Sequence, residues 1–521
     1  MLSPSISPLL AALPLAHALQ IPLRAHERTP STCPDYTKYS QKPHEPLSSG
    51  PLALPFMRPA PECRTFTSPA VERVIGDMKQ RIRDPDLARL FENTFPSTLD
   101  TTVKYFDPTA NLAFIVTGWI RDTGNQFAHL VNLLPQDENL QALVKAVINT
   151  EARYLSQFPY CGAFQPPPES GLAPSFNDWA AGVTVNPPVD DKLVFECKYE
   201  LDSLASFLKL SRSYYDSTED ASFINDNWLA AVKQTLRVIV EQSQSSEVEG
   251  ESVSYYNWTG SLGSLAPRIP NKGNGKPVKA NGLVASHHRP SDDPCFYKFI
   301  TSVNAMMAVE LDHIARILEQ EAKHLDHLSR EARRYSTLIR DAIWDHTMVE
   351  GDIFAYETDG FGNQYIIDDA NVPSLLSLPY LGFLDRNDPT YKRTKAKMWS
   401  NENPFYAEGK QFSGVGGPHV SPDSPWPMSH ISAIFGTDDD DEIKERLAMI
   451  LENTSGLGLI HESLSVHSSS AYTRPWFAWA NSYFAEMILD LAERKPQLIF
   501  DDDTPYSINQ DGTRIDDVIE M

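Results

Sequence analysis

Residues 303–344 read VNAMMAVELDHIARILEQEAKHLDHLSREARRYSTLIRDAIW, the longest run of helical periodicity in the chain. Apolar side chains in this run recur at spacings of three and four, which places them on one face of an α-helix. The pattern breaks near His324, so we expect two consecutive helices rather than one. Two amphipathic helices in sequence must bury their apolar faces against each other or against neighbours. A helical hairpin is therefore the expected building unit.

The same spacing recurs on both sides of this run. It appears at Leu140, Val144, Val147 and Glu151, at Leu201, Leu204, Ala205 and Leu208, at Trp228, Val232, Leu236 and Ile239, and at Ala480, Phe484, Ile488 and Leu491 before Pro496. Helices thus recur roughly every 40 to 50 residues over about 420 residues, while alternating strand patterns are scarce. No sequence repeat is visible, which favours a closed ring over an open solenoid. We predict an all-α fold, an α/α toroid whose long loops form the face that holds the site.

Composition limits the kinds of partner. The chain has 521 residues, with 45 Lys and Arg against 69 Asp and Glu, and a formal net charge of −24. Such a surface repels phosphate backbones and anionic lipid, so nucleic acid and membrane surfaces are unfavourable partners. The sequence contains no uninterrupted run of about 18 apolar residues, so we expect no membrane span. A neutral or cationic partner is more natural.

The N-terminal residues favour a secretory route. Residues 1–18 combine a short apolar core with Ala16-His17-Ala18, the small-x-small pattern of a signal-peptidase site, although no basic residue precedes Arg24. A disordered N-terminus is the alternative. Two N-x-S/T sequons, at Asn257 and Asn453, are compatible with secretion. Residues 19–62 are predicted to be an extended Pro/Ser-rich arm and 497–521 an acidic tail.

Five cysteines are too few for a disulfide scaffold, and their odd number leaves at least one free thiol. Cys33 and Cys63 flank the Pro-rich arm, and whether they form a bridge stays open. There is no C-x-x-C pair, so a structural zinc site lacks its ligand set.

Long loops and their neighbours carry most of the chemistry. Residues 164–188, 262–290 and 415–427 are Pro/Gly-rich loops of a length that usually indicates function. Carboxylates, aromatic rings and arginines gather in four segments, which are Thr117–Asp122, Glu196–Ser203, His288–Asp293, and His461–Ser463 together with Thr473–Asn481. Aromatic faces beside carboxylates suit sugar recognition, and two carboxyl groups can cleave a glycosidic bond.

Other catalytic patterns are incomplete. His461-Glu462 begins like a zincin motif, but the next histidine, His467, comes two positions too late. The chain has no G-x-S-x-G elbow and no phosphate-binding glycine loop. His324 and His327 share a helix face, which more simply indicates a solvated surface than a metal site.

Taken together, the segments resemble the metal-independent α-mannosidases of glycoside hydrolase family 125 over residues 33–496. The most specific matches are Phe195–Ser203 (FECKYELDS), Arg289–Asp293 (RPSDD), Asp368–Leu376 (DDANVPSLL), His461–Ser463 (HES) and Arg474–Asn481 (RPWFAWAN). The resemblance implies an (α/α)₆ toroid of the six-hairpin glycosidase type over residues 63–496. It also implies removal of terminal α-1,6-linked mannose with inversion, without a metal or other cofactor. We expect a monomer that acts on mannose-containing glycans in the secretory pathway or outside the cell.

The resemblance also implies roles for individual residues. Glu462 would be the general base, and the general acid would be Asp292 or Asp293, of which we favour Asp292. The pocket for the terminal sugar would be shaped by Arg121, Asp122, Glu200, Asp202, Arg289, Asp369, Asn371, His461 and Trp476. An inverting pair of carboxyls should lie roughly 6.5 to 9.5 Å apart, and the acid should have a raised pKa.

One segment departs from the family pattern. Thr117-Gly118 runs directly into Trp119-Ile120-Arg121-Asp122, where the family has about five further residues, including an aspartate. Losing a carboxylate contact in a dry pocket costs on the order of 1 to 3 kcal/mol. The alternative to an active enzyme is therefore a weak or inactive mannan-binding protein of the same fold.

Overall fold

The computed structural model describes residues 33–116, 118–248, 251–260 and 268–508. The predicted leader at 1–18 lies outside the described residues, as do 19–32 of the arm and 509–521 of the acidic tail. In the part of the chain that is described, no helix is long and apolar enough to cross a membrane.

The fold is helix-rich, with only short strands. The helices are α1 (Tyr36–Tyr39), α2 (Pro69–Arg81), α3 (Pro85–Thr94), α4 (Ser97–Thr101), α5 (Ile120–Ala128), α6 (Glu138–Gln157), α7 (Leu201–Thr218), α8 (Asp226–Gln242), α9 (Thr301–Glu321), α10 (Asp326–His346), α11 (Pro389–Met398), α12 (Pro427–Phe435), α13 (Asp440–Leu451) and α14 (Ala478–Arg494).

The strands pair into small antiparallel ribbons within the loops. They are β1 (Val103–Asp107), β2 (Leu112–Ile115), β3 (Ala163–Phe164), β4 (Val183–Asn186), β5 (Val194–Glu196), β6 (Glu247–Val248), β7 (Glu251–Ser252), β8 (Asn257–Gly260), β9 (Phe299–Ile300), β10 (Met348–Val349), β11 (Ile353–Phe354), β12 (Glu357–Thr358), β13 (Gln364–Tyr365), β14 (Tyr406–Glu408), β15 (Ser413–Val415), β16 (Ser463–Leu464) and β17 (Tyr472–Thr473).

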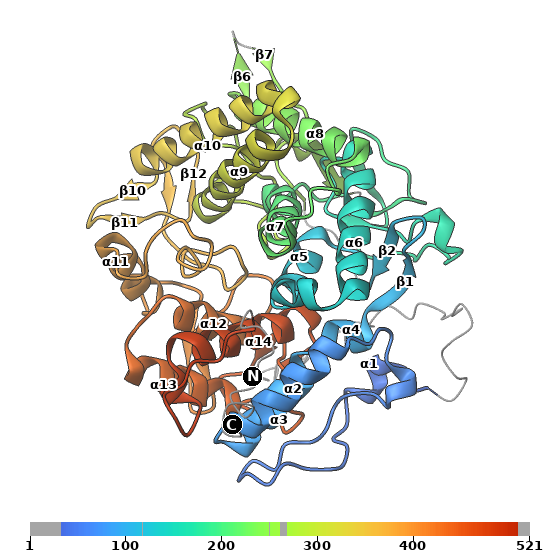
Figure 1. Ribbon diagram of the computed structural model, residues 1–521. Helices are drawn as coiled ribbons and strands as arrows, with labels where there is room; N and C mark the ends of the chain where they lie inside the picture. Colours follow the sequence, from blue (N-terminus) through green and yellow to red (C-terminus); the bar gives the residue numbers. More distant parts are fainter. Residues whose placement is uncertain (1–32, 117, 249–250, 261–267, 509–521) are drawn as a thin grey trace, which may run out of the picture.

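The hairpin predicted from residues 303–344 is present as α9 and α10. A single 3₁₀ turn at Lys323–Leu325 separates the two helices, at the predicted break. The two helices pack along each other, and Figure 1 shows them side by side. Helix α9 is buried on most of its surface, whereas α10 buries only one stripe. This difference indicates that α9 belongs to an inner layer and α10 to an outer layer.

Polar caps fix where several helices begin. The side chain of Asp137 accepts a hydrogen bond from Leu140 N at the start of α6, and Asn225 caps α8 through Trp228 N. At the other end of the chain, α14 stops at Arg494, two residues before Pro496. Pro lacks the N–H that a helix interior needs, so the sequence marks this boundary.

The inner helices contact one another in the order α9, α7, α5, α14 and α12. Helix α5 packs on α7, α7 on α9, α12 on α14, and α14 on α5. Helices α6 and α8 pack on each other outside this layer. Figure 1 shows the last helices of the chain beside the first, so segments far apart in sequence meet. The core runs continuously through these helices.

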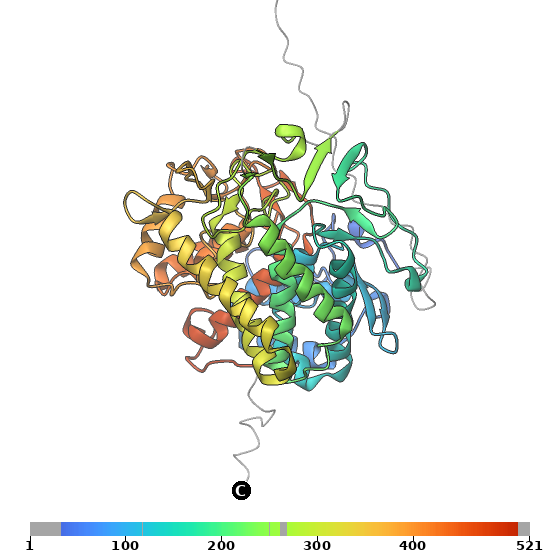
Figure 2. The same cartoon turned by 90° about the horizontal axis from the view of Figure 1, so that it is seen from above.

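The connecting segments gather on one side of the helices. Figure 2 shows the yellow and green helices on one side and the loops and short strands on the other. Two disulfides fasten these segments. Cys33 is bonded to Cys63, which fastens the N-terminal arm, and Cys161 is bonded to Cys197. The first bridge is the one left open by the sequence, and the second was not anticipated. Cys295 is the free cysteine of the five.

Candidate active site

A single buried cation organises the carboxylates of the loop side. Arg121 lies in the first turn of α5 with 4% of its side chain exposed. Its Nη1 donates to Glu200 Oε2 at 2.9 Å and lies 3.7 Å from Asp202 Oδ2. Its Nη2 lies 3.3 Å from Asp122 Oδ1 and 3.9 Å from Asp292 Oδ1. The site therefore places four carboxyl groups around one guanidinium.

Glu200 and Asp292 form a carboxyl–carboxyl pair within this cluster. Burial raises the pKa of Glu200 well above its ordinary value, although the charge of Arg121 opposes the shift. For Asp292, burial favours the neutral form, but the charges of Lys198 and Arg121 and a hydrogen bond from Glu200 outweigh it and lower the pKa. Glu200 Oε1 and Asp292 Oδ1 meet no hydrogen-bond donor among the described residues, and a proton shared by the two groups satisfies both. The two carboxyls of the pair therefore have opposite pKa shifts, with the pKa of Glu200 raised and that of Asp292 lowered.

This result corrects the expectation of a raised pKa for the favoured acid. The pKa of Asp292 is lowered because Lys198 and Arg121 lie against it, and neither contact follows from the local sequence.

Asp122 and Asp202 line the same cluster. Burial raises the pKa of each to about 6, in both cases against the charge of Arg121. Both oxygens of Asp202 lack a hydrogen-bond partner in the described part of the chain. Buried acceptors without donors are costly, so these oxygens are suited to receive hydroxyl groups from a bound molecule.

The Arg289–Asp293 turn presents its two aspartates to the pocket. Asp292 has φ of 67°, a left-handed conformation that a residue with a Cβ adopts at a cost of about 1 kcal/mol or more. Asp292 and Asp293 keep 22% and 24% of their side chains exposed. Arg289 faces the other way and donates to Glu357 Oε1 at 2.6 Å as a buried ion pair. Arg289 therefore holds the turn in place.

Asp369 and Asn371 support this turn from the neighbouring loop. Ser291 Oγ donates to Asp369 Oδ2 at 2.7 Å, and burial raises the pKa of Asp369. The backbone N–H of Asn371 donates to Asp369 Oδ1 at 3.3 Å. Its side-chain Nδ2 is buried and has no acceptor among the residues described, so it can donate to a ligand.

Glu462 enters the cluster from the last part of the chain. Its Oε1 accepts from Arg474 Nε at 2.9 Å, and 7% of its side chain is exposed. Arg474 also has a left-handed backbone, with φ of 51°, and its charge reaches Asp122 and Asp292. Glu462 and Asp292 therefore belong to one electrostatic cluster although 170 positions separate them.

His419 interacts with Asp293 and lies within electrostatic reach of Glu462. Its Nδ1 lies 3.6 Å from Asp293 Oδ2, and it also lies within the electrostatic reach of Glu462 and Asp292. Burial opposes its protonation, but a hydrogen bond to Asp293 and these negative charges raise its pKa. His419 comes from the 415–427 loop, which the sequence singled out by length alone.

Two predicted pocket residues have structural partners. His461 is buried, with Nδ1 3.1 Å from Arg474 O and Nε2 3.1 Å from Thr454 O, and a neutral ring donates its one N–H to one of these two carbonyls. Burial lowers its pKa to about 4, so it is neutral and positions the Arg474 loop. Trp476 donates from Nε1 to Ser97 Oγ at 3.1 Å, and its ring meets that of Tyr36 edge to face. These contacts direct Trp476 toward the N-terminal arm.

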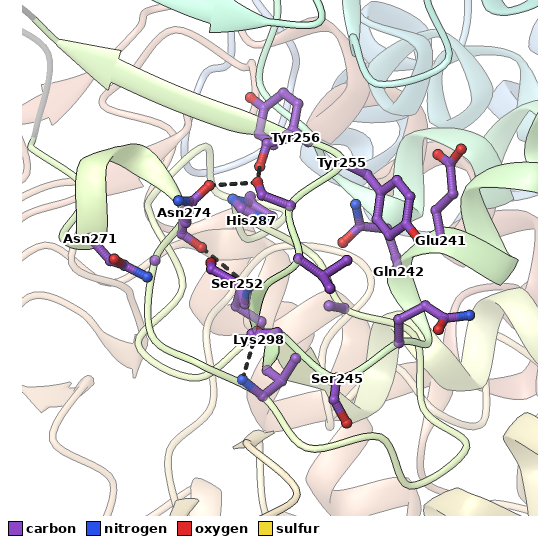
Figure 3. Close-up of a pocket in the computed structure, with 17 residues that line it drawn as sticks. Glu241, Gln242, Ser245, Ser252, Tyr255, Tyr256, Asn271, Asn274, His287 and Lys298 are labelled. Carbon is purple, nitrogen blue, oxygen red and sulfur yellow. Dashed lines mark hydrogen bonds between the residues drawn. The ribbon is translucent and has the colours of Figure 1, made fainter. Parts of the chain in front are cut away.

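A separate polar pocket lies behind this cluster. Figure 3 shows it lined by hydroxyl and amide side chains around Tyr256, His287 and Lys298. Tyr256 forms part of the wall between the two sites, because its hydroxyl donates to Cys197 O at 2.8 Å. None of the predicted site residues lines this pocket.

Comparison with known proteins identifies the family. The family model of the metal-independent α-mannosidases, glycoside hydrolase family 125, matches residues 84–489. The chain belongs to this family. A Schizosaccharomyces pombe relative, meiotically up-regulated gene 157 protein, is 46% identical over 506 residues, which is 94% of this chain and 97% of the relative.

A solved structure supports the same family assignment. The Streptococcus pneumoniae metal-independent α-mannosidase, in a non-productive complex with α-1,6-mannobiose, superposes with a TM-score of 0.74 at 27% identity. The match covers 82% of this chain and 99% of that protein. The family resemblance read from the sequence motifs is confirmed.

Gly118, in the segment expected to be shorter than in the family, borders an apolar cavity. Gly118 has φ of 60°, and a Cβ there would lie 2.2 Å from Phe164 O, so only glycine fits. The cavity beside Gly118 is walled by Phe114, Val147 and Phe164 and also contains the carboxyl of Glu151. Neither oxygen of Glu151 has a partner in the described residues, and burial raises its pKa well above the ordinary value. Thr117 lies outside the described residues.

Sequence reasoning missed several residues of the site. Lys198 and Glu196 stand within a quoted motif but received no role, and their side chains approach each other at 3.5 Å near Asp292. Arg474 and His419 were likewise unassigned. All four residues lie in segments that the sequence analysis had singled out for their charge or loop length, and this location could have indicated a role in the site.

Proposed function

We propose that this GH125 protein is an exo-acting α-mannosidase that removes terminal α-1,6-linked mannose with inversion. The observation that carries the proposal is the union, in one cluster, of the Glu200 and Asp292 carboxyls around Arg121 with Glu462 held by Arg474. Membership of the α-mannosidase family and the mannobiose complex of the S. pneumoniae relative support the choice of sugar.

Asp292 acts as the general acid. Glu200 has 1% of its side chain exposed, whereas Asp292 has 22% and so reaches the pocket. Asp292 passes the proton of the pair to the glycosidic oxygen as the bond from that oxygen to the anomeric carbon breaks. Both carboxyls of the pair are then ionised, Arg121 and Lys198 stabilise their negative charge, and the pair regains its proton from solvent before the next turnover.

Glu462 acts as the general base. Its second carboxylate oxygen removes a proton from water, and the water oxygen forms the new bond to the anomeric carbon from the opposite face of the sugar. Arg474 orients Glu462 through the 2.9 Å contact. Asp122, Asp202 and Asn371 then receive the hydroxyls of the terminal mannose.

The arrangement of the helices supports a finer description of the fold. We take the inner helices α5, α7, α9, α12 and α14, with the outer helices, as part of an (α/α)₆ toroid. Two disulfides support an oxidising compartment, in keeping with secretion.

A second candidate function follows from the shortened loop at Gly118. A mannan-binding protein would keep the hydroxyl-binding carboxylates but lack turnover. The intact Glu200–Asp292 pair and Glu462 favour the enzyme.

Kinetics on mannobioses test the proposal. Wild type should hydrolyse α-1,6-mannobiose in preference to the α-1,2 and α-1,3 isomers. Glu462→Gln and Asp292→Asn should each lower kcat by on the order of 10²- to 10⁴-fold. Lys145→Gln, at a half-exposed lysine paired with Asp220 on the outer helices, serves as the control. Mannobiose binding without hydrolysis at any pH would establish the second candidate instead.

A further inference from the structure

Two large aromatic side chains project into solvent from the loop that precedes β4. Phe176 is 74% exposed and Trp179 is 58% exposed, the highest values among the large hydrophobic residues described. The two rings stand three positions apart in a segment that buries neither of them. Apolar rings held in water at neighbouring positions are typical of a binding surface.

Hydrogen bonds tie this segment to the rim of the candidate active site. Asn177 Oδ1 accepts from the backbone N–H groups of Trp179 and Ala180 at 3.0 and 3.4 Å, which closes a tight turn between the two rings. Asn177 Nδ2 donates to Phe195 O at 3.4 Å. After this turn the chain enters β4, which pairs with β8 along its whole length.

The anchor point is one residue from the catalytic cluster. Phe195 precedes Glu196, whose charge acts on Asp292 and His419 through the pocket. The Phe195 ring meets the Trp119 ring edge to face, with centroids 5.3 Å apart, and Trp119 is followed by Ile120 and Arg121. Phe195 and Trp119 therefore connect the turn that carries Phe176 and Trp179 to the segments that carry Glu196 and Arg121.

We propose that Phe176 and Trp179 form a platform on which an outer sugar of the substrate stacks, beyond the linkage that is cleaved. The inference rests on the proposed function. In an exo-acting enzyme the terminal sugar enters the carboxylate cluster, so the rest of the glycan must leave through the mouth. The apolar face of a pyranose packs on an exposed indole or phenyl ring, and such contacts need no charge. The substrate class is accordingly an α-1,6-linked mannan longer than a disaccharide.

The test compares a long with a short substrate. The measured quantity is the ratio of kcat/KM for α-1,6-mannotetraose to that for α-1,6-mannobiose. Trp179→Ala should lower this ratio roughly threefold to tenfold, through KM rather than kcat. Trp179→Phe should restore most of it. Phe361→Ala is the matched control, because Phe361 is 57% exposed in the turn between β12 and β13.

Each outcome decides the question. An unchanged ratio in Trp179→Ala, or an equal fall in Phe361→Ala, overturns the platform. If wild type hydrolyses neither substrate, the proposed function fails and the platform is judged by calorimetry with mannotetraose. Weaker binding to Trp179→Ala than to wild type then supports it, and equal binding overturns it.

Discussion

Replacing Arg121 by methionine tests the electrostatics of the site. The substitution keeps the volume of the aliphatic chain but leaves Glu200, Asp202, Asp122 and Asp292 without the cation that lies 2.9 to 3.9 Å from each. Removing one partner from a buried ion pair typically costs about 3 to 5 kcal/mol, because the remaining charge stays desolvated. We expect Arg121→Met to lower the free energy of unfolding by about that amount at pH 7.5.

The loss should shrink in acid. The folded-state pKa of Asp122 and of Asp202 is about 6, above the ordinary value near 3.8, so both carboxyls take up protons between pH 7.5 and pH 5. At pH 5 the removal of Arg121 then leaves less uncompensated negative charge.

Urea denaturation at the two pH values measures the effect. Arg330→Met serves as the control, because its ion pair with Asp326 is 72% and 64% exposed and should contribute at most about 1 kcal/mol. The reasoning is refuted if Arg121→Met costs no more than the control, or if its cost is the same at both pH values.

Three further predictions concern other parts of the molecule. Burial raises the folded-state pKa of Glu151, so the stability that comes from its protonated form is present at low pH and is lost as the pH rises. Glu151→Gln should therefore raise the melting temperature at pH 8 but not at pH 4. Equal shifts at the two pH values would contradict this. Replacing Cys161 and Cys197 by serine should lower the free energy of unfolding by about 4 kcal/mol in urea titrations, and an unchanged free energy would contradict this. His419→Gln should change the pH–rate profile, since the pKa of His419 is raised by Asp293 and the nearby carboxylates, and an unaltered profile would exclude a role for its protonation.

The helical part of the fold was predictable because its signal is local. The break between α9 and α10 and the end of α14 before Pro496 follow from periodicity and proline chemistry. Helix α13 likewise begins in an acidic run, where the side chain of Asp439 accepts from the backbone N–H groups of Asp441 and Glu442. The short strands were not predicted, because a strand such as β12 has only two residues and cannot show an alternating apolar pattern in the sequence.

The sequence predicted which residues form the site better than it predicted their pKa shifts and their contacts. The motifs name the residues around Arg121, but the pKa direction of Asp292 depends on Lys198, which lies 94 positions earlier in the chain. A backbone hydrogen bond from His288 N to Tyr199 O brings the two segments together. Similarly, Cys161 and Cys197 are 36 positions apart, and only the folded chain brings them together. Long-range contacts of this kind leave no mark on the local sequence.

The stereochemistry of the released sugar tests the central claim most directly. Proton NMR can follow α-1,6-mannobiose with purified protein and identify the first anomer released, before mutarotation. The account predicts β-mannose, the product expected when Glu462 activates water opposite the leaving group. Initial release of α-mannose would contradict it, because Glu462 would then have to act as a nucleophile.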